Sequence, residues 1–406
     1  MGSIKILENT VQTYAWGSRT AIAELLGKPS PAAAPWAEMW MGAHPKAPSM
    51  VHETGGAVSL IDLITANPEA TLGRTTARMF DNRLPFLFKV LAAETPLSIQ
   101  AHPDKVQAEQ GFERENRAGI PLDAPQRNYR DTSHKPECLC ALTPFFVLCG
   151  FRPVPDILEM FFLLLPEAEV VQLTPNLVNR SAPEGLRSFI MQLLHLSAGR
   201  REAVLAWAVD RAEDLVDQDP AFQWIVRLSR TFPGDIGALA PGFLNLVNLE
   251  PGQALFLPAG TLHSYLEGTG LEVMANSDNV LRGGLTAKHV DTDELSRILA
   301  FKPMVPRILR PVAVSKCERL YPTPAPEFSL SVMSITGDQP CSPANHNSAE
   351  ILLCVQGEAV LCEEKGGEET SLFKGMSAFI PASAGSYHLK GDAVFYRAFV
   401  PPSSEV

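Results

Sequence analysis

The sequence lacks any long apolar run. Its densest apolar stretch, Met160 to Leu165, is only a few residues long, whereas a helix that crosses a bilayer needs roughly 20 such residues. The first ten residues, MGSIKILENT, also lack the apolar core of a secretory signal. We therefore expect neither a membrane partner nor an exported leader.

Positive charge is scarce as well. The chain has 34 Lys and Arg residues against 45 Asp and Glu residues, which gives a formal net charge of −11. No stretch rich in Lys or Arg offsets this balance, so we expect no nucleic-acid partner. If the substrate is an anion, a few basic residues must gather locally around it.

No CxxC pair occurs among the seven cysteines, and the closest pair is Cys138 and Cys140. An odd number of scattered cysteines is not typical of a disulfide framework or of a thiolate metal site. The pattern favours reduced, mostly buried thiols and predicts a cytoplasmic protein.

Three kinds of pattern follow one another along the 406 residues. Up to about Gly150, short apolar runs such as LPFLFKVLAA alternate with Pro, Gly and Asn and predict buried strands. From Pro153 to about Pro233 the apolar residues take helical spacing, as at Leu186, Phe189, Ile190, Leu193 and Leu194. Strand patterns return from Gly242, and a second β-rich stretch follows a Pro-rich link.

The most specific local signal is Gly252-QALFL-Pro258-Ala-Gly260-TL-His263. It matches the second cupin motif, in which a Gly turn enters a strand, a Pro-x-Gly turn leaves it, and a His follows on the next strand. A His that points into a small barrel is costly unless it is hydrogen-bonded or binds a metal. His263 is therefore either a metal ligand or a hydrogen-bonded core histidine, and the motif favours the ligand.

Three further side chains could complete a metal site. Gln100 and His102 are two residues apart in PLSIQAHPDK, a spacing that places both on one face of a strand. Glu137 begins another apolar run. His102 could instead be a loop histidine and Glu137 a strand-edge carboxylate. Together with His263, however, these residues offer four nitrogen and oxygen donors, a set that suits one tetrahedral zinc ion able to polarise a carbonyl.

The C-terminal β-rich stretch repeats the motif in a degenerate form. Gly375-MSAFI-Pro381 has the same Gly-x5-Pro entry, but Ser383 replaces the next Gly and Ser386 replaces the metal His. The pattern predicts a second barrel without a metal site. His388, two residues further on, is the alternative ligand there.

These patterns predict a mainly β protein with an α insertion, built from two cupin (jelly-roll) barrels and a helical domain. We expect a zinc-binding catalytic cupin domain at residues 1–150 and 236–305, with a helical insertion domain at 151–235. Residues 306–406 should form the degenerate C-terminal cupin domain.

Long segments of the chain resemble the type I mannose-6-phosphate isomerase family, in the family's order and over essentially the whole length. The segments are VQTYAWGS, AEMWMGAHPKAPS, LPFLFKVLAAETPLSIQAHPDK, RNYRDTSHKPE, LPAGTLHSYLEG and LEVMANSDNVLRGGLTAKHVD. The resemblance implies one zinc held by Gln100, His102, Glu137 and His263, with Arg282 in the active site. It also implies a cytoplasmic enzyme, expected as a monomer, that interconverts mannose 6-phosphate and fructose 6-phosphate through an enediol and supplies GDP-mannose metabolism.

That reaction needs a general base, an electrophile and cations for the phosphate. The candidate catalytic residues are Arg282, Lys135, Glu272, Asp278 and His134. The candidate substrate-binding residues are Trp16, Glu38, Ser98, Lys105 and Lys288, with His44 in a neighbouring segment. Several have structural alternatives: Lys105 and Lys288 could be solvated surface charges, Trp16 plain core, and Glu38 part of a buried salt bridge.

Two other functions fit a cupin with this set of ligands. A metal dioxygenase would use iron in the same shell, but it needs an apolar pocket, and the many basic residues near the motifs disfavour it. A sugar-binding cupin without catalysis is disfavoured by the complete set of ligands and by Arg282. The sequence leaves the identity of the catalytic base open.

Overall fold

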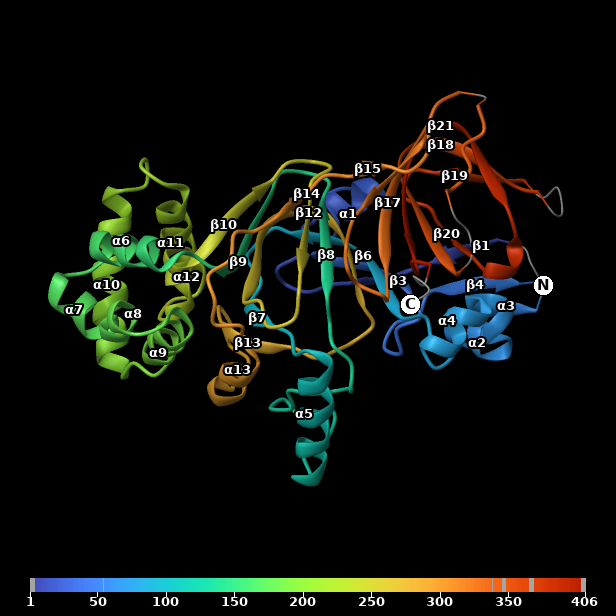
Figure 1. Ribbon diagram of the computed structural model, residues 1–406. Coiled ribbons are helices and arrows are strands. Elements are labelled where there is room, and N and C mark those ends of the chain that lie inside the picture. Colours follow the sequence, from blue (N-terminus) through green and yellow to red (C-terminus); the bar gives the residue numbers. More distant parts are fainter. Residues whose placement is uncertain (1–3, 54, 338, 345–347, 365–368, 403–406) are drawn as a thin grey trace.

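The computed structural model describes residues 4–53, 55–337, 339–344, 348–364 and 369–402. Figure 1 shows three parts in a row, with a helical part at one end, a β-barrel in the middle and a second β-barrel at the other end. The predicted class, mainly β with an α insertion, is confirmed.

The middle barrel is an 11-stranded sheet, here called the central sheet, with the order β14-β11-β8-β12-β6-β3-β2 along its main path. Its strands are β2 (Thr10–Gln12), β3 (Glu38–Gly42), β6 (Phe86–Ala93), β7 (Ile99–Ala101), β8 (Glu137–Ala141), β9 (Phe145–Phe151), β10 (Leu244–Leu249), β11 (Ala254–Leu257), β12 (His263–Ala275), β13 (Leu281–Gly284) and β14 (Ile308–Leu309). The long strand β12 pairs with β6 and β8 at one end and with β7 and β9 at the other. All eight residues of β6 are buried, which explains why its sequence reads as one apolar run.

The second barrel is a 10-stranded sheet, here called the C-terminal sheet, with the order β15-β16-β17-β21-β18-β20-β1-β4-β5. Its strands are β1 (Lys5–Glu8), β4 (Met50–Glu53), β5 (Gly56–Ser59), β15 (Val312–Ala313), β16 (Glu318–Tyr321), β17 (Ser329–Ile335), β18 (Glu350–Glu363), β19 (Glu369–Phe373), β20 (Ser377–Ile380) and β21 (Tyr387–Phe399). Three of them come from the first 60 residues, which the sequence analysis placed in the catalytic barrel. Strand β1 pairs with the otherwise free edge of β20. No local sequence pattern predicts this pairing.

The insertion is helical as predicted. It contains α6 (Val154–Leu164), α7 (Glu167–Leu173), α8 (Pro175–Asn179), α9 (Ala182–Leu194), α10 (Ala198–Asp214) and α11 (Pro220–Thr231), followed by η1 (Ile236–Leu239) and α12 (Ala240–Phe243). In α9 the predicted apolar face is buried from Leu186 to Leu193, and Leu194 is half-buried. Phe189 lies between Phe161 and Phe243 and joins the helices to the barrel.

Short helices inside the supposed strand regions were not predicted. They are α1 (Ala21–Leu25), α2 (Leu60–Ala66), α3 (Pro68–Leu72), α4 (Arg74–Met79), α5 (Lys105–Arg117) and α13 (Thr292–Ile298), with η2 (Ala382–Ala384) as a single 3-10 turn. The expectation of strands alone up to Gly150 is therefore wrong. A capping box of Asp104 and Gln107 begins α5, and that pair was a usable signal in the sequence.

The prediction of reduced thiols is wrong for two cysteines. Cys317 and Cys341 form a disulfide, with Cα atoms 5.9 Å apart. Cys341 pairs with Leu389 of β21, and Cys317, just before β16, accepts a hydrogen bond from Ser334 N of β17, the strand between β16 and β21. Sequence spacing does not reveal this proximity. Cys138, Cys140, Cys149, Cys354 and Cys362 are free and buried as predicted. Burial raises the pKa of Cys140 to about 11, so this thiol stays protonated.

No helix in the described part of the chain combines the length and apolar character needed to span a membrane.

Candidate metal centre and active site

The pairing of strands in the central sheet brings the predicted ligands together. His263 in β12 is the register partner of Gln100 in β7, and Gln100 is also the partner of Arg282 in β13. Directly paired residues project to the same face of a sheet, so these three side chains share one face. Strand β7 ends at Ala101, and His102 therefore lies just beyond the strand rather than on it, contrary to the strand-face argument.

His102, Glu137 and His263 form a buried cluster whose possible ligand atoms all lie within 4.8 Å of one another. The Nε2 atom of His102 lies 3.2 Å from Glu137 Oε1, and the Nε2 atom of His263 lies 3.3 Å from Glu137 Oε2. The exposed fractions of the three residues are 3%, 1% and 1%. The cluster is fully shielded from solvent.

The hydrogen bonds of the two histidines decide which nitrogen is free. The Nδ1 atoms of His102 and His263 donate to the main-chain oxygens of Asn279 and Thr261 at 2.7 and 2.9 Å. Both Nε2 atoms are left without a hydrogen-bond partner. Burial lowers the pKa of His102 to about 4, so its Nε2 carries a lone pair at neutral pH. Two buried Nε2 atoms that face one carboxylate and have no hydrogen-bond partner fit a bound cation.

Lys135 completes the electrostatics of the cluster. Its Nζ lies 3.1 Å from Glu137 Oε1, and both side chains are buried. Burial works to raise the pKa of Glu137, but Lys135 and His102 outweigh it and hold the pKa well below its ordinary value. Glu137 is therefore a permanent carboxylate, as a metal ligand must be. Of the candidate catalytic residues, Lys135 is the one in contact with this cluster.

Next to the cluster, a buried lysine holds two carboxylates. Lys89 Nζ lies 2.8 Å from Glu272 Oε2 and 3.5 Å from Glu38 Oε1. The hydroxyl of Tyr265 donates to Glu272 Oε1 at 2.9 Å and lies 3.4 Å from Glu137 Oε2, which links this network to the metal cluster. Trp40 Nε1 donates to Glu38 Oε2 at 2.9 Å. Glu38 is thus in a buried ion pair, the alternative that the sequence left open.

The network has unusual protonation properties. Burial works against the Lys89 ammonium, yet Glu272 and Glu38 raise the pKa of Lys89 above its ordinary value. Burial raises the pKa of Glu272, although Lys89 works to lower it. Sequence reasoning missed Lys89 and Tyr265. The usable signal for Lys89 was a lone charge inside the apolar run LPFLFKVLAA, because a buried lysine needs partners.

A group of cations lies beyond the cluster. Burial and the neighbouring Arg130 both lower the pKa of Arg282. Burial, Arg282 and Arg130 likewise lower the pKa of Lys288. Arg282 and Arg130 are half-buried and Lys288 is exposed, and three like charges gathered in one place favour an anion. Arg130 was missed by the sequence analysis, while Lys105 stays exposed and pairs with Glu109 at 3.5 Å.

Two candidate catalytic residues are engaged away from the metal cluster. His134 Nε2 lies 2.5 Å from Glu327 Oε1, and Glu327 lies in the loop between β16 and β17 of the C-terminal sheet. Asp278 pairs with His44 Nε2 at 3.5 Å and with Lys46 Nζ at 2.9 Å. Neither His134 nor Asp278 contacts a ligand of the triad in the described structure.

Trp16 and Ser98 lie on loops near the network. The Trp16 ring stacks on Tyr14 at 5.8 Å and is half-buried against a buried cluster that contains Tyr265. Ser98 is half-buried directly before β7. Among the described residues its side chain has no hydrogen-bond partner, which leaves it available to a ligand.

Two half-buried loops are clamped together beside the metal cluster. The carboxylate of Asp131 accepts hydrogen bonds from Ser133 N and Ser277 Oγ, both at 2.8 Å. The side-chain amide of Asn279 donates to the main-chain oxygens of Asp131 and Ser133 at 2.9 and 2.8 Å. The main-chain oxygen of the same Asn279 orients His102. We call Asp131 and Asn279 the loop clamp.

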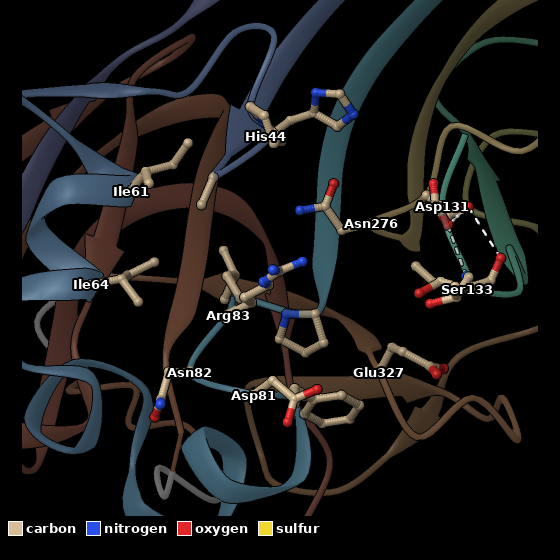
Figure 2. A pocket seen from close by; sticks show the side chains of 18 of the residues that line it. His44, Ile61, Ile64, Asp81, Asn82, Arg83, Asp131, Ser133, Asn276 and Glu327 are labelled. Carbon is tan, nitrogen blue, oxygen red and sulfur yellow. Dashed lines mark hydrogen bonds between the residues drawn. The ribbon is translucent and has the colours of Figure 1, made fainter. Parts of the chain in front are cut away.

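A cavity of about 890 Å³ lies beside the site (Figure 2). Its walls come from α2, the end of α4 with the loop after it, the loops that contain Asp131 and Ser277, and the segment that contains Glu327. His44, Asp278, Lys105 and Arg130 also line it, whereas the metal triad does not. The volume is within the range of small-molecule sites.

In the C-terminal sheet, Glu350 occupies the strand position that Glu137 has in the central sheet, but other side chains surround it. Glu137 pairs with Leu257, the residue before Pro258. Glu350 pairs with Ile380, the residue before Pro381, and so stands at the matching position of the second barrel.

The partners of Glu350 are an arginine and a tyrosine. Arg397 Nε donates to Glu350 Oε2 at 2.7 Å, Arg397 Nη1 lies 2.8 Å from Glu318 Oε1, and Tyr387 donates to Glu350 Oε2 at 2.7 Å. All four side chains are buried. Tyr387 points inward, and His388, which follows it, is half-buried opposite Cys362. The guanidinium of Arg397 thus balances the charge of Glu350.

Comparisons with known proteins agree over nearly the whole chain. Residues 4–154 match the family model of the type I phosphomannose isomerase catalytic domain, and residues 318–400 match that of the mannose-6-phosphate isomerase cupin domain. The mannose-6-phosphate isomerase of Escherichia coli (strain K12) is 42% identical over 396 residues, which cover 97% of this chain and 98% of that protein. The human mannose-6-phosphate isomerase is 34% identical over 411 residues, or 93% of each chain.

Solved structures of such enzymes share the fold. A zinc-bound mannose 6-phosphate isomerase superposes with a TM-score of 0.88 at 41% identity, over 98% of this chain and 100% of that one. A mutant of the phosphomannose isomerase from Salmonella typhimurium gives a TM-score of 0.89 at 40% identity, again over 98% and 100%. Because the matches run through both barrels and the helical insertion, the chain belongs to the type I mannose-6-phosphate isomerase family.

Proposed function

We propose that this chain is a zinc-dependent isomerase that interconverts mannose 6-phosphate and fructose 6-phosphate through an enediol. The observation that carries the proposal is the pair of unpartnered Nε2 atoms on His102 and His263, both directed at Glu137. A buried cluster of this kind needs a divalent cation. The relatives that match it over nearly their whole length carry the same activity in their names.

In this proposal His102, Glu137, His263 and Gln100 hold the zinc. A zinc ion held there would supply a positive charge able to polarise an oxygen of the sugar. Gln100 belongs to the set because it is paired with His263 and projects to the same face of the sheet.

Proton transfer between C1 and C2 is assigned to Glu272. Its raised pKa makes it a stronger base than an ordinary glutamate. Lys89 and Tyr265 bind its two oxygens and fix its orientation. The loss of either hydrogen bond in the enzyme–substrate complex would free the oxygen that takes the proton.

Arg282 stands beside Gln100 by register and is therefore the cation we assign to the charge that develops on the enediolate. Arg130 and Lys288, the other members of the cationic group, are assigned to the phosphate. Their mutual repulsion is relieved when a dianion binds.

A coupled assay tests the function. Purified protein is supplied with mannose 6-phosphate, and fructose 6-phosphate is measured with and without a chelator. We expect turnover that a chelator abolishes and zinc restores, and no turnover in His263→Ala, which should also lose zinc. Turnover in metal-free protein, or normal zinc content in His263→Ala, would show that the assigned ligands are wrong.

The two alternative functions fit less well. A dioxygenase needs an apolar pocket, whereas Lys89, Lys135 and Arg282 surround this site. A sugar-binding protein has no need of a buried carboxylate with a raised pKa. Dependence of turnover on oxygen would favour the first alternative, and zinc-loaded protein without isomerase activity would favour the second.

We also propose the division into a catalytic cupin domain (1–150 and 236–305), a helical insertion (151–235) and a C-terminal cupin domain without a metal site (306–406). The support for the last point is that Arg397 fills the charge requirement of Glu350. We expect metal analysis to find one zinc per chain in the wild type and the same amount in His388→Ala. Because β1 of the first 60 residues pairs with β20, we expect the C-terminal barrel to need these residues in order to fold.

Finally, we propose a monomer in the cytoplasm that supplies GDP-mannose metabolism. Five free cysteines support a reducing compartment, and the Cys317–Cys341 disulfide is the feature that departs from it. Sedimentation analysis and cell fractionation test these two points, and loss of the gene should be rescued by mannose.

A further inference from the structure

Helix α5 buries a carboxylate where a helix ordinarily buries an apolar side chain. Figure 1 shows α5 projecting from the central barrel. The buried residues of this helix are Ala108, Gly111 and Glu115, and the exposed fraction of Glu115 is 7%. A glutamate is almost never fully buried unless it is paired. The inner face of α5 is therefore organised around the groups that Glu115 binds, not around an apolar core.

Glu115 binds the chain directly before Arg130. Its Oε1 accepts a hydrogen bond from Asn128 N at 3.0 Å, and its Oε2 accepts one from Tyr129 N at 2.9 Å. Arg127 Nε lies 2.9 Å from the same Oε2 and also donates to Tyr129 O at 2.6 Å. Both carboxylate oxygens are thus occupied by this short segment. Because each bound peptide unit is planar, the direction in which the chain enters Arg130 is fixed.

Two further contacts support the same segment. Gly111 lies against the ring of Tyr129, and a Cβ atom on Gly111 would lie only 2.3 Å from Tyr129 Cζ. Glycine weakens the interior of a helix, so its presence here serves the close approach of the ring. The hydroxyl of Tyr129 donates to Glu294 Oε1 of α13 at 2.7 Å. The segment is therefore fixed to both α5 and α13.

Arg130 itself is held at its main chain and at its side chain. Its N donates to Asn279 Oδ1 of the loop clamp at 2.7 Å, and its Nη1 donates to the main-chain oxygen of Leu122, in the loop after α5, at 2.5 Å. The charge of Arg130 acts on Arg282 and Lys288. Within the residues that the structure describes, no carboxylate pairs with Arg130. Its charge is therefore available to an anion.

We propose that Glu115 is a positioning residue that fixes Arg130 for the substrate phosphate. This inference rests on the proposed function, which assigns Arg130 to that phosphate. Glu115 acts through Asn128 and Tyr129 and not by contact with the substrate. A guanidinium binds a phosphate through two directed hydrogen bonds, so a small displacement of its backbone weakens the contact. Glu115 should therefore set the affinity for the substrate and leave the turnover rate unchanged.

Glu115→Gln tests the proposal, because it keeps the size of the side chain and one of its acceptors. Arg127 still donates to Ile120 O and Asn116 Oδ1, at 2.6 and 2.7 Å, which preserves the fold. In zinc-loaded protein we expect KM for mannose 6-phosphate and the calorimetric Kd of inorganic phosphate to rise together about tenfold. The values of kcat and zinc content should not change. Glu113→Gln changes an exposed carboxylate of the same helix and should alter neither constant.

Gly111→Ala is a second variant, and it decides the question if Glu115→Gln does not fold. It leaves the carboxylate in place but pushes on the ring of Tyr129, and it should raise both constants in the same direction. In an Arg130→Ala background, Glu115→Gln should have no further effect on either constant, because the residue through which it acts is already gone.

Unchanged constants in both variants overturn the proposal. A fall in kcat at unchanged KM also overturns it, and so does a full additional loss in the Arg130→Ala background, since Glu115 would then act on general stability. The phosphate titration needs no turnover. An inactive wild type would therefore contradict the proposed function alone, and the titration would still decide the role of Glu115.

Discussion

At the scale of single residues, the chemistry depends on which atom of a side chain is left free. His102 and His263 are held by main-chain oxygens at Nδ1, which leaves Nε2 for a metal. Lys89 and Lys135 are both buried, and each lies against carboxylates. Asp278 is held ionised by His44 and Lys46. None of these assignments depends on residue type alone.

Arg282 should serve the transition state more than substrate binding. Lysine at this position keeps the charge but loses the fork of two parallel donors. We expect Arg282→Lys to lower kcat on the order of 10²-fold or more, the effect of removing one preorganised electrostatic group. Steady-state kinetics, with zinc content confirmed as normal, measure it. A rise in KM at unchanged kcat would instead place Arg282 at the phosphate.

Asp278 should make the stability of the fold depend on acid pH. Burial works to raise the pKa of Asp278, but hydrogen bonds from His44 and Lys46 hold it well below its ordinary value. Its stabilising contribution is therefore complete above the unfolded pKa of about 4 and is lost as pH falls through the folded value. Asp278→Asn should be less stable than wild type near pH 7, and the difference should shrink below about pH 4.

Urea unfolding at several pH values measures this difference. Asp123→Asn, which changes an exposed carboxylate, is the control and should show no such pH-dependent gap. A constant gap between wild type and Asp278→Asn across the acid range would contradict the assignment.

At the scale of elements, strand pairing brings the ligands together, and short loops set the orientation of His102. Strand β12 provides His263 at its start and Glu272 nine residues along, but the orientation of His102 depends on the loop clamp. Asn279 joins the loop before β8 to the loop after β12. A change in the clamp is therefore transmitted to a metal ligand without touching the metal.

Asp131→Ala should weaken zinc binding. It removes the acceptor for Ser133 N and Ser277 Oγ and so loosens the loop that orients His102. We expect zinc affinity or activity to fall roughly 10- to 100-fold, as when groups that orient metal ligands are removed. Competition with a chelator measures the affinity. Asp219→Ala removes a helix cap on the distant α11 and should cost stability without changing zinc affinity; equal zinc loss in both variants would mean general destabilisation.

At the scale of the whole molecule, two barrels of the same design balance a buried carboxylate in different ways. The central barrel surrounds Glu137 with two histidines and a lysine, and the C-terminal barrel surrounds Glu350 with Arg397 and Tyr387. An arginine is always charged, so the second barrel needs no ion to be stable. The interface between the barrels includes Cys140, which lies against Tyr321 and Tyr396.

Arg397→Met should strongly destabilise the C-terminal barrel. The substitution leaves Glu350 and Glu318 buried without their cation, a change that typically costs about 3–5 kcal/mol. Chemical unfolding measures the loss. Arg319→Met, on the exposed side of β16, should shift the unfolding free energy by no more than about 0.5 kcal/mol. A small effect at Arg397 would show that the buried charges have another partner.

The sequence by itself determined the class of the fold, the helical insertion and the three residues of the buried cluster, His102, Glu137 and His263. These features depend on local periodicity, as in α9, and on a motif whose spacing is tied to one turn and one strand, as at His263. A helix face or a metal-ligand motif formed by residues close together in the chain can be predicted from the local sequence. For the same reason the capping box that begins α5 was predictable, although it was overlooked.

Only the tertiary structure decided which of the predicted residues meet. His134 binds Glu327 and not the metal cluster. Lys89 lies in the middle of an apolar strand and binds carboxylates of the site. Arg130 lies on a loop distant in the sequence and interacts with Arg282. Cys317 and Cys341 became neighbours through an antiparallel bridge. Each of these outcomes depends on pairing between strands or loops far apart in the chain, where contact is selected by the packing of the whole barrel rather than by the local sequence.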